Sequence, residues 1–210
     1  MSYSLPNFDY LKVLINEKGA LAFVVRNWLP DKESQPLLEQ LASTVPFAQA
    51  ELQMYGKPVL TPRQMYGMGD KLPSSDMGDD ARIHTYSNTD FRLNPWIPEV
   101  EAIRNRIVKE SGCHLNSCLM NEYKDGSQYI AYHSDREAMG FNNIVVTVSL
   151  GGSRDFYFKS KFDDRPTIQT VLYNGDCCVM FGDCQKLFTH SIPKRAHGEY
   201  RIALTFRELL

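Results

Sequence analysis

The stretch Tyr200-Arg201-Ile202-Ala203-Leu204-Thr205-Phe206-Arg207 has the length and composition of a buried strand, and it closes a series of strand-like segments. Turn residues such as Gly151-Gly152 and Asn174-Gly175-Asp176 separate these segments. About eight short strands joined by turns are typical of a double-sheet jelly roll. The expected strands cover residues 117–123, 128–133, 144–150, 155–159, 170–173, 177–181, 188–192 and 200–206.

The first half of the chain predicts helices that support this sheet. An apolar segment at 20–25 has strand length, and Asp31 can cap the helix that follows it. Gly112 is placed to end a second helix. Apolar residues recur at helical spacing in both: Leu37, Leu38, Leu41 and Val45, then Val100, Ile103, Ile107 and Val108. We therefore expect an α+β fold in which N-terminal helices brace one sheet of the jelly roll.

Length and charge limit the possible organisation of the chain. With 210 residues the chain is long enough for one well-buried domain. We expect residues 1–210 to form this single domain, with support from about 20 to 112 and the jelly-roll core at 113–210. The net charge is only −2, so contact with nucleic acid requires a local basic patch rather than the overall field. We expect a monomer.

The five cysteines show no regular spacing and do not suggest a disulfide framework. The pair Cys177-Cys178 with Cys184 resembles a zinc motif, but alternate residues of 177–181 are more simply explained as the filling of a sheet interior. No apolar run has the roughly 18 residues of a membrane span, and the start lacks the pattern of a signal peptide. The sequence therefore predicts an intracellular protein, in the nucleus or cytoplasm, without membrane contact.

The triplet His133-Ser134-Asp135 predicts a metal site. Side chains two residues apart on a strand point to one face, so an imidazole and a carboxylate are aimed at the same point. Alone the triplet is weak, and for His133 by itself a hydrogen-bonded histidine at a sheet rim is the better explanation. His190, in His190-Ser191-Ile192-Pro193, adds the second imidazole of the facial triad found in non-haem Fe(II) oxygenases.

Arg201 and Arg207 offer planar cationic groups for a dicarboxylate such as 2-oxoglutarate. They lie on the same face of one strand and roughly 20 Å apart, at ~3.3 Å per residue. That distance is too long for both to bind one end of a small acid, so we expect Arg207 at the opposite carboxylate or on a bulged strand. A buried Arg201 requires an anionic partner, and an internal Asp or Glu is the alternative to a ligand.

A series of motifs runs through the chain in a fixed order. They are 53–57, 62–64, 85–87, Asn121-Glu122-Tyr123-Lys124-Asp125-Gly126, His133-Ser134-Asp135-Arg136-Glu137, Ser149-Leu150-Gly151, Arg154-Asp155-Phe156, His190-Ser191-Ile192-Pro193 and Arg201-x-Ala203-x-Thr205-x-Arg207. In these motifs the chain resembles the AlkB family of Fe(II)/2-oxoglutarate dioxygenases, which demethylate nucleic acids, and most of all the animal homologues that repair DNA. The resemblance spans most of the chain from about Ala22 onward.

The resemblance implies a double-stranded β-helix with a nucleotide-recognition lid and assigns roles to individual residues. The implied iron ligands are His133, Asp135 and His190, and the implied 2-oxoglutarate residues are Asn121, Tyr123, Arg201, Thr205 and Arg207. The implied substrate-binding residues are Tyr55, Gly56 and Lys57 on a finger hairpin, Arg63 at the nucleic-acid backbone, His84, Thr85, Tyr86 stacked on the flipped base, and Arg136 and Glu137 near its edge. From spacing alone, a Tyr55 ring folded onto the sheet would be more common than an exposed wedge.

The implied activity is oxidative demethylation of bases such as 1-methyladenine or 3-methylcytosine in DNA or RNA. It would use Fe(II), O2 and 2-oxoglutarate and release succinate, CO2 and formaldehyde. Two alternatives are an oxygenase of the same cofactor class that acts on a protein or a small molecule, and a non-catalytic nucleic-acid binder. Tyr55, Arg63 and Tyr86 argue against the first alternative, and the intact triad argues against the second.

Two departures from the family pattern affect these expectations. Ala203 stands where the family usually has Asn, so one polar contact near the cosubstrate is missing and we expect weaker binding. The segment 159–165 is short and mixed in charge, whereas relatives specific for double strands carry a longer basic loop there. This difference leaves single-stranded DNA or RNA open as the substrate.

Overall fold

The computed structural model describes residues 10–54, 57–70, 83–86, 89–135 and 143–209, with only the backbone described at 52–54, 57, 83–86 and 89–92. The helices are α1 (Asp31–Thr44), α2 (Pro98–Ser111) and the short α3 (Cys184–Leu187). The strands are β1 (Leu11–Glu17), β2 (Ala20–Val25), β3 (Ala48–Met54), β4 (Lys57–Gly69), β5 (Ile83–Tyr86), β6 (Thr89–Arg92), β7 (Ser117–Tyr123), β8 (Ile130–His133), β9 (Val145–Gly151), β10 (Arg154–Ser160), β11 (Ile168–Leu172), β12 (Cys177–Gly182), β13 (Phe188–Ile192) and β14 (Arg201–Arg207).

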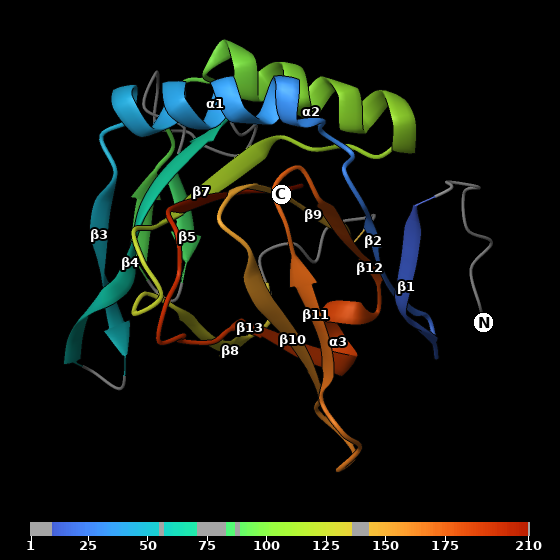
Figure 1. The fold of residues 1–210 in the computed structure, drawn as a ribbon. Helices are drawn as coiled ribbons and strands as arrows, with labels where there is room; N and C mark the ends of the chain where they lie inside the picture. Colours follow the sequence, from blue (N-terminus) through green and yellow to red (C-terminus); the bar gives the residue numbers. More distant parts are fainter. Residues whose placement is uncertain (1–9, 55–56, 71–82, 87–88, 136–142, 210) are drawn as a thin grey trace.

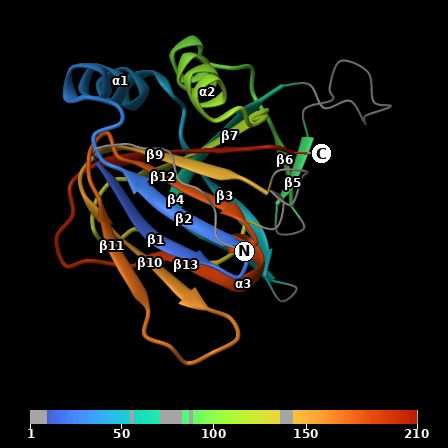
Figure 2. The ribbon, with the colours of Figure 1, turned by 90° about the vertical axis from the view of Figure 1, so that its right-hand side faces the viewer.

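The strands form a large and a small sheet that face each other, with α1 and α2 on the far side of the large sheet (Figures 1 and 2). The large sheet has the order β1-β2-β12-β9-β14-β7-β4-β3, and the small sheet has the order β11-β10-β13-β8. A two-stranded sheet, β5-β6, lies outside them. This arrangement is a jelly roll braced by N-terminal helices, as the sequence predicts.

The central strands of the large sheet, such as β2, β9 and β14, are buried on both faces, which explains the continuous apolar sequence of β2. In β2, Leu21, Phe23 and Val25 pack in the core that includes α1 and α2. Ala20, Ala22 and Val24, which alternate with them, pack in the second core between the two sheets. The small alanines on the inner face leave room for the large aromatic side chains of β10, Phe156 and Phe158. Alternation along each strand therefore builds two cores from one sheet.

Strand β14 follows the same alternation, and this places two arginines on the face toward the small sheet. Ile202, Leu204 and Phe206 face the helices and are fully buried. The residues between them, Arg201, Ala203, Thr205 and Arg207, therefore share the face toward the small sheet. Strand β7 pairs with β14 in register, Arg201 opposite Tyr123 and Ala203 opposite Asn121, so Tyr123 and Asn121 face the same interior.

The structure corrects two details at the N-terminal side. Asp31 is the first residue of α1 rather than its cap; Pro30 takes the cap position and no side chain caps the helix. Strand β1, which is not among the expected strands, pairs with β2 across the two-residue turn Lys18-Gly19. Both turn residues have positive φ, 51° and 82°, as hairpin turns of this length require.

The end of α2 and the β3–β4 hairpin agree with the sequence. Gly112 ends α2 in the left-handed conformation, φ 69°, and its N–H donates to the carbonyl of Val108. Strands β3 and β4 pair up to Met54 and Lys57, as expected for a hairpin with residues 55–56 at its tip. The tip itself lies outside the described residues.

Candidate metal and cosubstrate site

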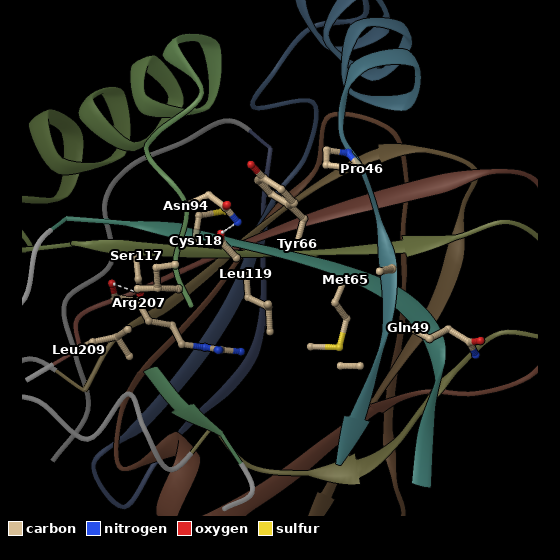
Figure 3. A pocket seen from close by; sticks show the side chains of 14 residues that line it. Pro46, Gln49, Met65, Tyr66, Asn94, Ser117, Cys118, Leu119, Arg207 and Leu209 are labelled. Carbon is tan, nitrogen blue, oxygen red and sulfur yellow. Dashed lines mark hydrogen bonds between the residues drawn. The ribbon is translucent and has the colours of Figure 1, made fainter. Parts of the chain in front are cut away.

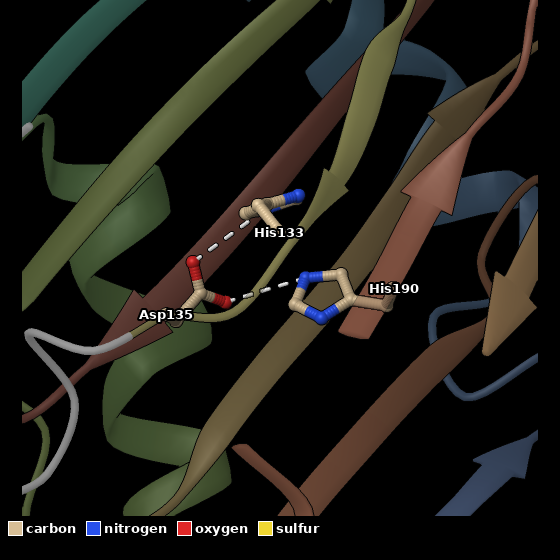
Figure 4. Close-up of side chains that lie close together, drawn as sticks. All are labelled: His133, Asp135 and His190. Atoms are coloured by element: carbon tan, nitrogen blue, oxygen red, sulfur yellow. Dashed lines mark ion pairs between the residues drawn. The ribbon is translucent and has the colours of Figure 1, made fainter. Parts of the chain in front are cut away.

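The sequence-predicted triad comes together at one point between the sheets (Figure 4). Strands β8 and β13 are antiparallel neighbours, and His133 pairs directly with His190. Asp135 lies two residues past the end of β8, with Oδ1 at 3.7 Å from His133 Nε2 and Oδ2 at 3.5 Å from His190 Nε2. One ligand atom from each residue lies within 4.8 Å of the other two.

A β-bulge in β8 aims His133 at this point. Ile192 pairs with Ile130 and His190 with His133, so β8 has one more residue than β13 over the same length. Three residues apart, Ile130 and His133 would otherwise face opposite sides, yet both line the interior cavity. The Nδ1–H of His133 donates to the carbonyl of Ala131 at 2.9 Å, which leaves Nε2 as the nitrogen that can bind a metal.

Asp135 is held from two sides and is almost completely buried. Its Oδ1 accepts a hydrogen bond from Arg207 Nη2 at 2.7 Å, and its backbone N–H donates to Gln185 Oε1 at 2.9 Å. Burial alone would raise the pKa of Asp135, but Arg207 and the two histidines outweigh it and lower the pKa to about 2. Asp135 is therefore a carboxylate at neutral pH.

Both histidines are neutral at neutral pH. Burial lowers the pKa of His190 to about 3, with a further contribution from His133, and burial also lowers the pKa of His133. The rings lie side by side, with centroids 4.2 Å apart. Neutral imidazoles and an ionised carboxylate are the forms in which these side chains bind metal ions.

The unpartnered atoms of this cluster fit a divalent cation. Oδ2 of Asp135 is buried without a hydrogen bond, although a buried carboxylate oxygen normally has a partner. A cation bound to Oδ2 and the two Nε2 atoms would satisfy it. Within the described part of the chain, this is the one cluster of His, Cys, Asp or Glu side chains that could hold an ion. The five cysteines are buried and free, and Cys177 and Cys178 of β12 pack in the two cores, which agrees with a sheet-filling role for this pair.

Arg201 lies beside the interior cavity: it contacts the lining residue Tyr123 but is not itself among the lining residues. It is 0% exposed, and its Nη2 donates to Ser149 Oγ at 2.8 Å. Its Nε and Nη1 have no hydrogen-bond partner. Among the described residues no Asp or Glu forms an ion pair with Arg201, so the alternative of an internal carboxylate partner receives no support. A buried guanidinium with two unused donors fits an anionic ligand.

The other expected cosubstrate residues share a cavity with the triad. Asn121, Tyr123, Thr205 and Arg207 line it together with the triad, and so does Ala203. Arg207 binds Asp135, whereas Arg201 binds Ser149, so the two arginines of β14 have different partners. The polar and cationic residues present would suit a dicarboxylate, for which Arg201 would offer its unused donors.

A larger cavity of about 340 Å³ adjoins this one, and Leu119 and Arg207 line both. Met65 and Leu119 extend to the same side of the sheet in Figure 3, while Tyr66 and Asn94 lie toward the helices. Pockets of roughly 300 Å³ upward are the size that holds small organic ligands.

Most of the expected substrate-binding residues lie where the structure describes no side chains, and Arg63 is the exception. Tyr55, Gly56, Arg136 and Glu137 lie outside the described residues. Lys57 begins β4, and His84, Thr85 and Tyr86 lie on β5, where the backbone alone is described.

Arg63 lies in the interior. It is 3% exposed, lines the small cavity, and donates through Nε to Asn121 Oδ1 at 2.6 Å. Its side chain is therefore beside the cavity that the triad lines.

Sequence reasoning missed the supporting residues of the site. Gln185, on α3, was not singled out, and a lone polar residue in Asp183-Cys184-Gln185-Lys186 gives no signal of its buried contact with Asp135. Met65 and Leu119 were missed because apolar strand residues look like core in sequence.

A jelly roll that carries two histidines and one carboxylate around a shared point defines a non-haem Fe(II) oxygenase. The family model described as "2OG-Fe(II) oxygenase superfamily" matches residues 22–207. In an alignment 234 residues long, the chain is 30% identical to "DNA oxidative demethylase ALKBH2" of Arabidopsis thaliana, and the alignment covers 100% of this chain and 73% of that protein. It is 31% identical over 182 residues to the Mus musculus protein of the same name, covering 82% and 72%.

A solved structure, "The structure of OsALKBH1", matches with a TM-score of 0.60 at 16% identity, covering 94% of this chain and 100% of that chain. This likeness supports the fold. The chain belongs to the 2OG-Fe(II) oxygenase superfamily and, within it, to the AlkB family. It is an enzyme of the Fe(II)/2-oxoglutarate-dependent dioxygenase class that uses O2. Among the described residues, no helix is long and apolar enough to cross a membrane.

Proposed function

We propose that this enzyme removes N-linked methyl groups from nucleic-acid bases of the 1-methyladenine or 3-methylcytosine type. The names of the Arabidopsis thaliana and Mus musculus relatives support a DNA substrate. The observation that carries the proposal is the cavity of about 340 Å³ beside the triad, because an extruded base needs such a space within reach of the metal.

Each group of residues has a proposed part in the reaction. His133, Asp135 and His190 hold Fe(II), and Asn121, Tyr123, Arg201, Thr205 and Arg207 bind 2-oxoglutarate. The bound Fe(II) supplies the oxidative chemistry, in which O2 converts 2-oxoglutarate to succinate and CO2 and the methyl group leaves as formaldehyde. The substrate-binding set is Tyr55, Gly56, Lys57, Arg63, His84, Thr85, Tyr86, Arg136 and Glu137.

The protein's own side chains orient the metal ligand Asp135, balance its charge and shape the cavity wall. Arg207 holds the Asp135 carboxylate in place, and Gln185 holds its backbone. The inward position of Arg63 supports a role at the cavity wall, beside Asn121, instead of at the nucleic-acid backbone. Apolar residues at the wall, such as Met65 and Leu119, favour binding of a flat base by contact area rather than by a fixed set of hydrogen bonds.

The charge of the β10–β11 loop supports a single-stranded substrate. Arg165 forms ion pairs with Asp163, at 2.6 Å, and with Glu17. Lys161 Nζ donates to the carbonyl of Gln185 at 2.7 Å. The positive charges of this loop are thus engaged within the protein, which leaves less charge for a complementary strand. We further propose that the enzyme acts as a monomer in the nucleus or cytoplasm.

Mass spectrometry of methylated oligonucleotides tests the proposed function. Incubation with Fe(II), O2 and 2-oxoglutarate should reduce the oligonucleotide mass by one methylene per lesion, faster on a single strand than on the same strand in a duplex. Asp135→Ala should abolish the change, and Asp164→Ala, an exposed carboxylate, should leave it intact. An unchanged mass with the unmodified enzyme, while 2-oxoglutarate is still consumed, would contradict a nucleic-acid substrate and favour a protein or small molecule.

A further inference from the structure

Arg154, in the motif Arg154-Asp155-Phe156, is a buried cation that the proposed reaction does not use. It is 0% exposed. Its Nη2 donates to the carbonyls of Gln128 and Pro193, both at 2.7 Å, and its Nη1 donates to the carbonyl of Asp125 at 3.2 Å. Among the described residues no Asp or Glu forms an ion pair with it, and its Nε has no partner. Burying such a charge without a carboxylate is costly, so its position requires a reason.

The three carbonyls belong to segments that lead into and out of the metal-binding strands. Asp125 and Gln128 lie in the turn between β7 and β8, and β8 carries His133. Pro193 directly follows β13, which carries His190. Next to these carbonyls, Ile130 pairs with Ile192. Arg154 thus joins the two strands at the end of the site that lies away from the triad.

Arg154 also contacts the ring of Tyr123, and Arg201 contacts the same ring. Each guanidinium carbon lies 5.2 Å from the ring centroid. Burial lowers the pKa of Arg201 to about 10, and the nearby charge of Arg154 contributes to this shift. Two cations therefore lie around one aromatic ring, with no described carboxylate paired to either. Such a region strongly favours an anion at the unused donors of Arg201.

We propose that Arg154 is a positioning residue for the far carboxylate of 2-oxoglutarate: it holds the Tyr123 ring in place and adds positive charge behind Arg201. The proposal rests on the proposed cosubstrate roles of Tyr123 and Arg201. Backbone carbonyls take three of the four Nη N–H donors of Arg154, so we assign it an indirect role, through Tyr123 and Arg201, rather than a contact with the acid itself. Its effect should be specific for a ligand with a second carboxylate.

The test compares two 2-oxo acids in the presence of Mn²⁺, which replaces Fe(II) without turnover. 2-Oxoglutarate has the far carboxylate, whereas 2-oxobutyrate lacks it. Dissociation constants are measured by thermal shift for the unmodified enzyme, Arg154→Met and Arg154→Lys. Arg195→Met is the matched control, because Arg195 binds the neighbouring carbonyl of Ser153 and pairs with Asp155. Among the described residues, the arginines that contact the Tyr123 ring are Arg154 and Arg201.

We expect Arg154→Met to weaken 2-oxoglutarate binding about 10- to 100-fold, the usual range for a residue that supports a ligand-binding group. Binding of 2-oxobutyrate and of Mn²⁺ should change less than about twofold, and Arg195→Met should resemble the unmodified enzyme. Arg154→Lys keeps the charge but not the flat group over the ring, so it should be intermediate. If Arg154→Met does not fold, the binding of the two acids by Arg154→Lys provides the test.

Three results would overturn the role of Arg154: unchanged 2-oxoglutarate binding, equal weakening of both acids, or the same loss in Arg195→Met. Equal weakening would show that Arg154 merely holds the fold. Failure of the unmodified enzyme to bind 2-oxoglutarate would instead overturn the cosubstrate site itself, and the role of Arg154 with it. Nucleic acid is absent from the experiment, so a different substrate would not affect its outcome.

Discussion

Replacement of Arg201 by methionine should make the cosubstrate-free enzyme more stable and its cosubstrate binding much weaker. Burial lowers the pKa of Arg201 from its ordinary 12.5 to about 10. At 1.36 kcal/mol per unit, the folded state bears a penalty of about 3 kcal/mol for this charge. Because the folded pKa is depressed, the unfolded chain binds the proton more tightly, and the whole penalty is present at pH 7.

Arg201→Met removes this penalty and loses one hydrogen bond to Ser149, worth about 1 kcal/mol. We therefore expect a net gain of about 2 kcal/mol in the free energy of unfolding without cosubstrate, measured by urea denaturation. Removing one partner of a buried charge pair costs at least about 2 kcal/mol, so 2-oxoglutarate binding should weaken about 30-fold or more. Arg195→Met, a half-buried control, should retain the binding.

The reasoning on Arg201 would be refuted by the opposite pattern. A loss of several kcal/mol in unfolding free energy without cosubstrate would show that Arg201 stabilises the fold by itself. Undiminished thermal stabilisation by 2-oxoglutarate in Arg201→Met would show that the acid binds elsewhere.

Three further predictions concern other parts of the structure. Gln185→Leu removes the acceptor of the Asp135 backbone N–H and should weaken Mn²⁺ binding about 10-fold; unchanged affinity would contradict a supporting role. Leu41→Ala, in the core under α1, should lower the free energy of unfolding by about 2–5 kcal/mol in urea without altering metal affinity. Ala203→Asn places an amide opposite Asn121 at the cavity wall and should strengthen 2-oxoglutarate binding about fivefold, near 1 kcal/mol; weaker binding would show that the wall has no room for it.

The positions of residues that follow local backbone rules could be predicted from the sequence. Side chains on β14 alternate between two cores, so the spacing from Arg201 to Arg207 correctly indicated a shared face. The His133-Ser134-Asp135 spacing placed a histidine and a carboxylate together, and the antiparallel pairing of β8 with β13 added His190. Gly112 could be placed because a left-handed helix end favours glycine.

Features that depend on tertiary contacts could not be predicted. The bulge that aims His133 inward is one extra residue in β8, and the count becomes visible only when β13 pairs beside it. The buried contact of Arg63 is a second example, since the sequence has no sign that Asn121 accepts its Nε–H in the interior. Asp31 was expected as a cap, but the chain enters α1 one residue earlier, at Pro30.

The most direct test of the central claim is a calorimetric titration with Mn²⁺, in the absence of any substrate. The unmodified chain should bind one ion, because His133, Asp135 and His190 converge within 4.8 Å. Asp135→Ala should lose about 100-fold or more in affinity, since it removes the one anionic ligand and leaves Arg207 unpaired. Asp164→Ala should bind as the unmodified chain does. Equal affinity of Asp135→Ala and the unmodified chain would contradict a metal centre at these three residues.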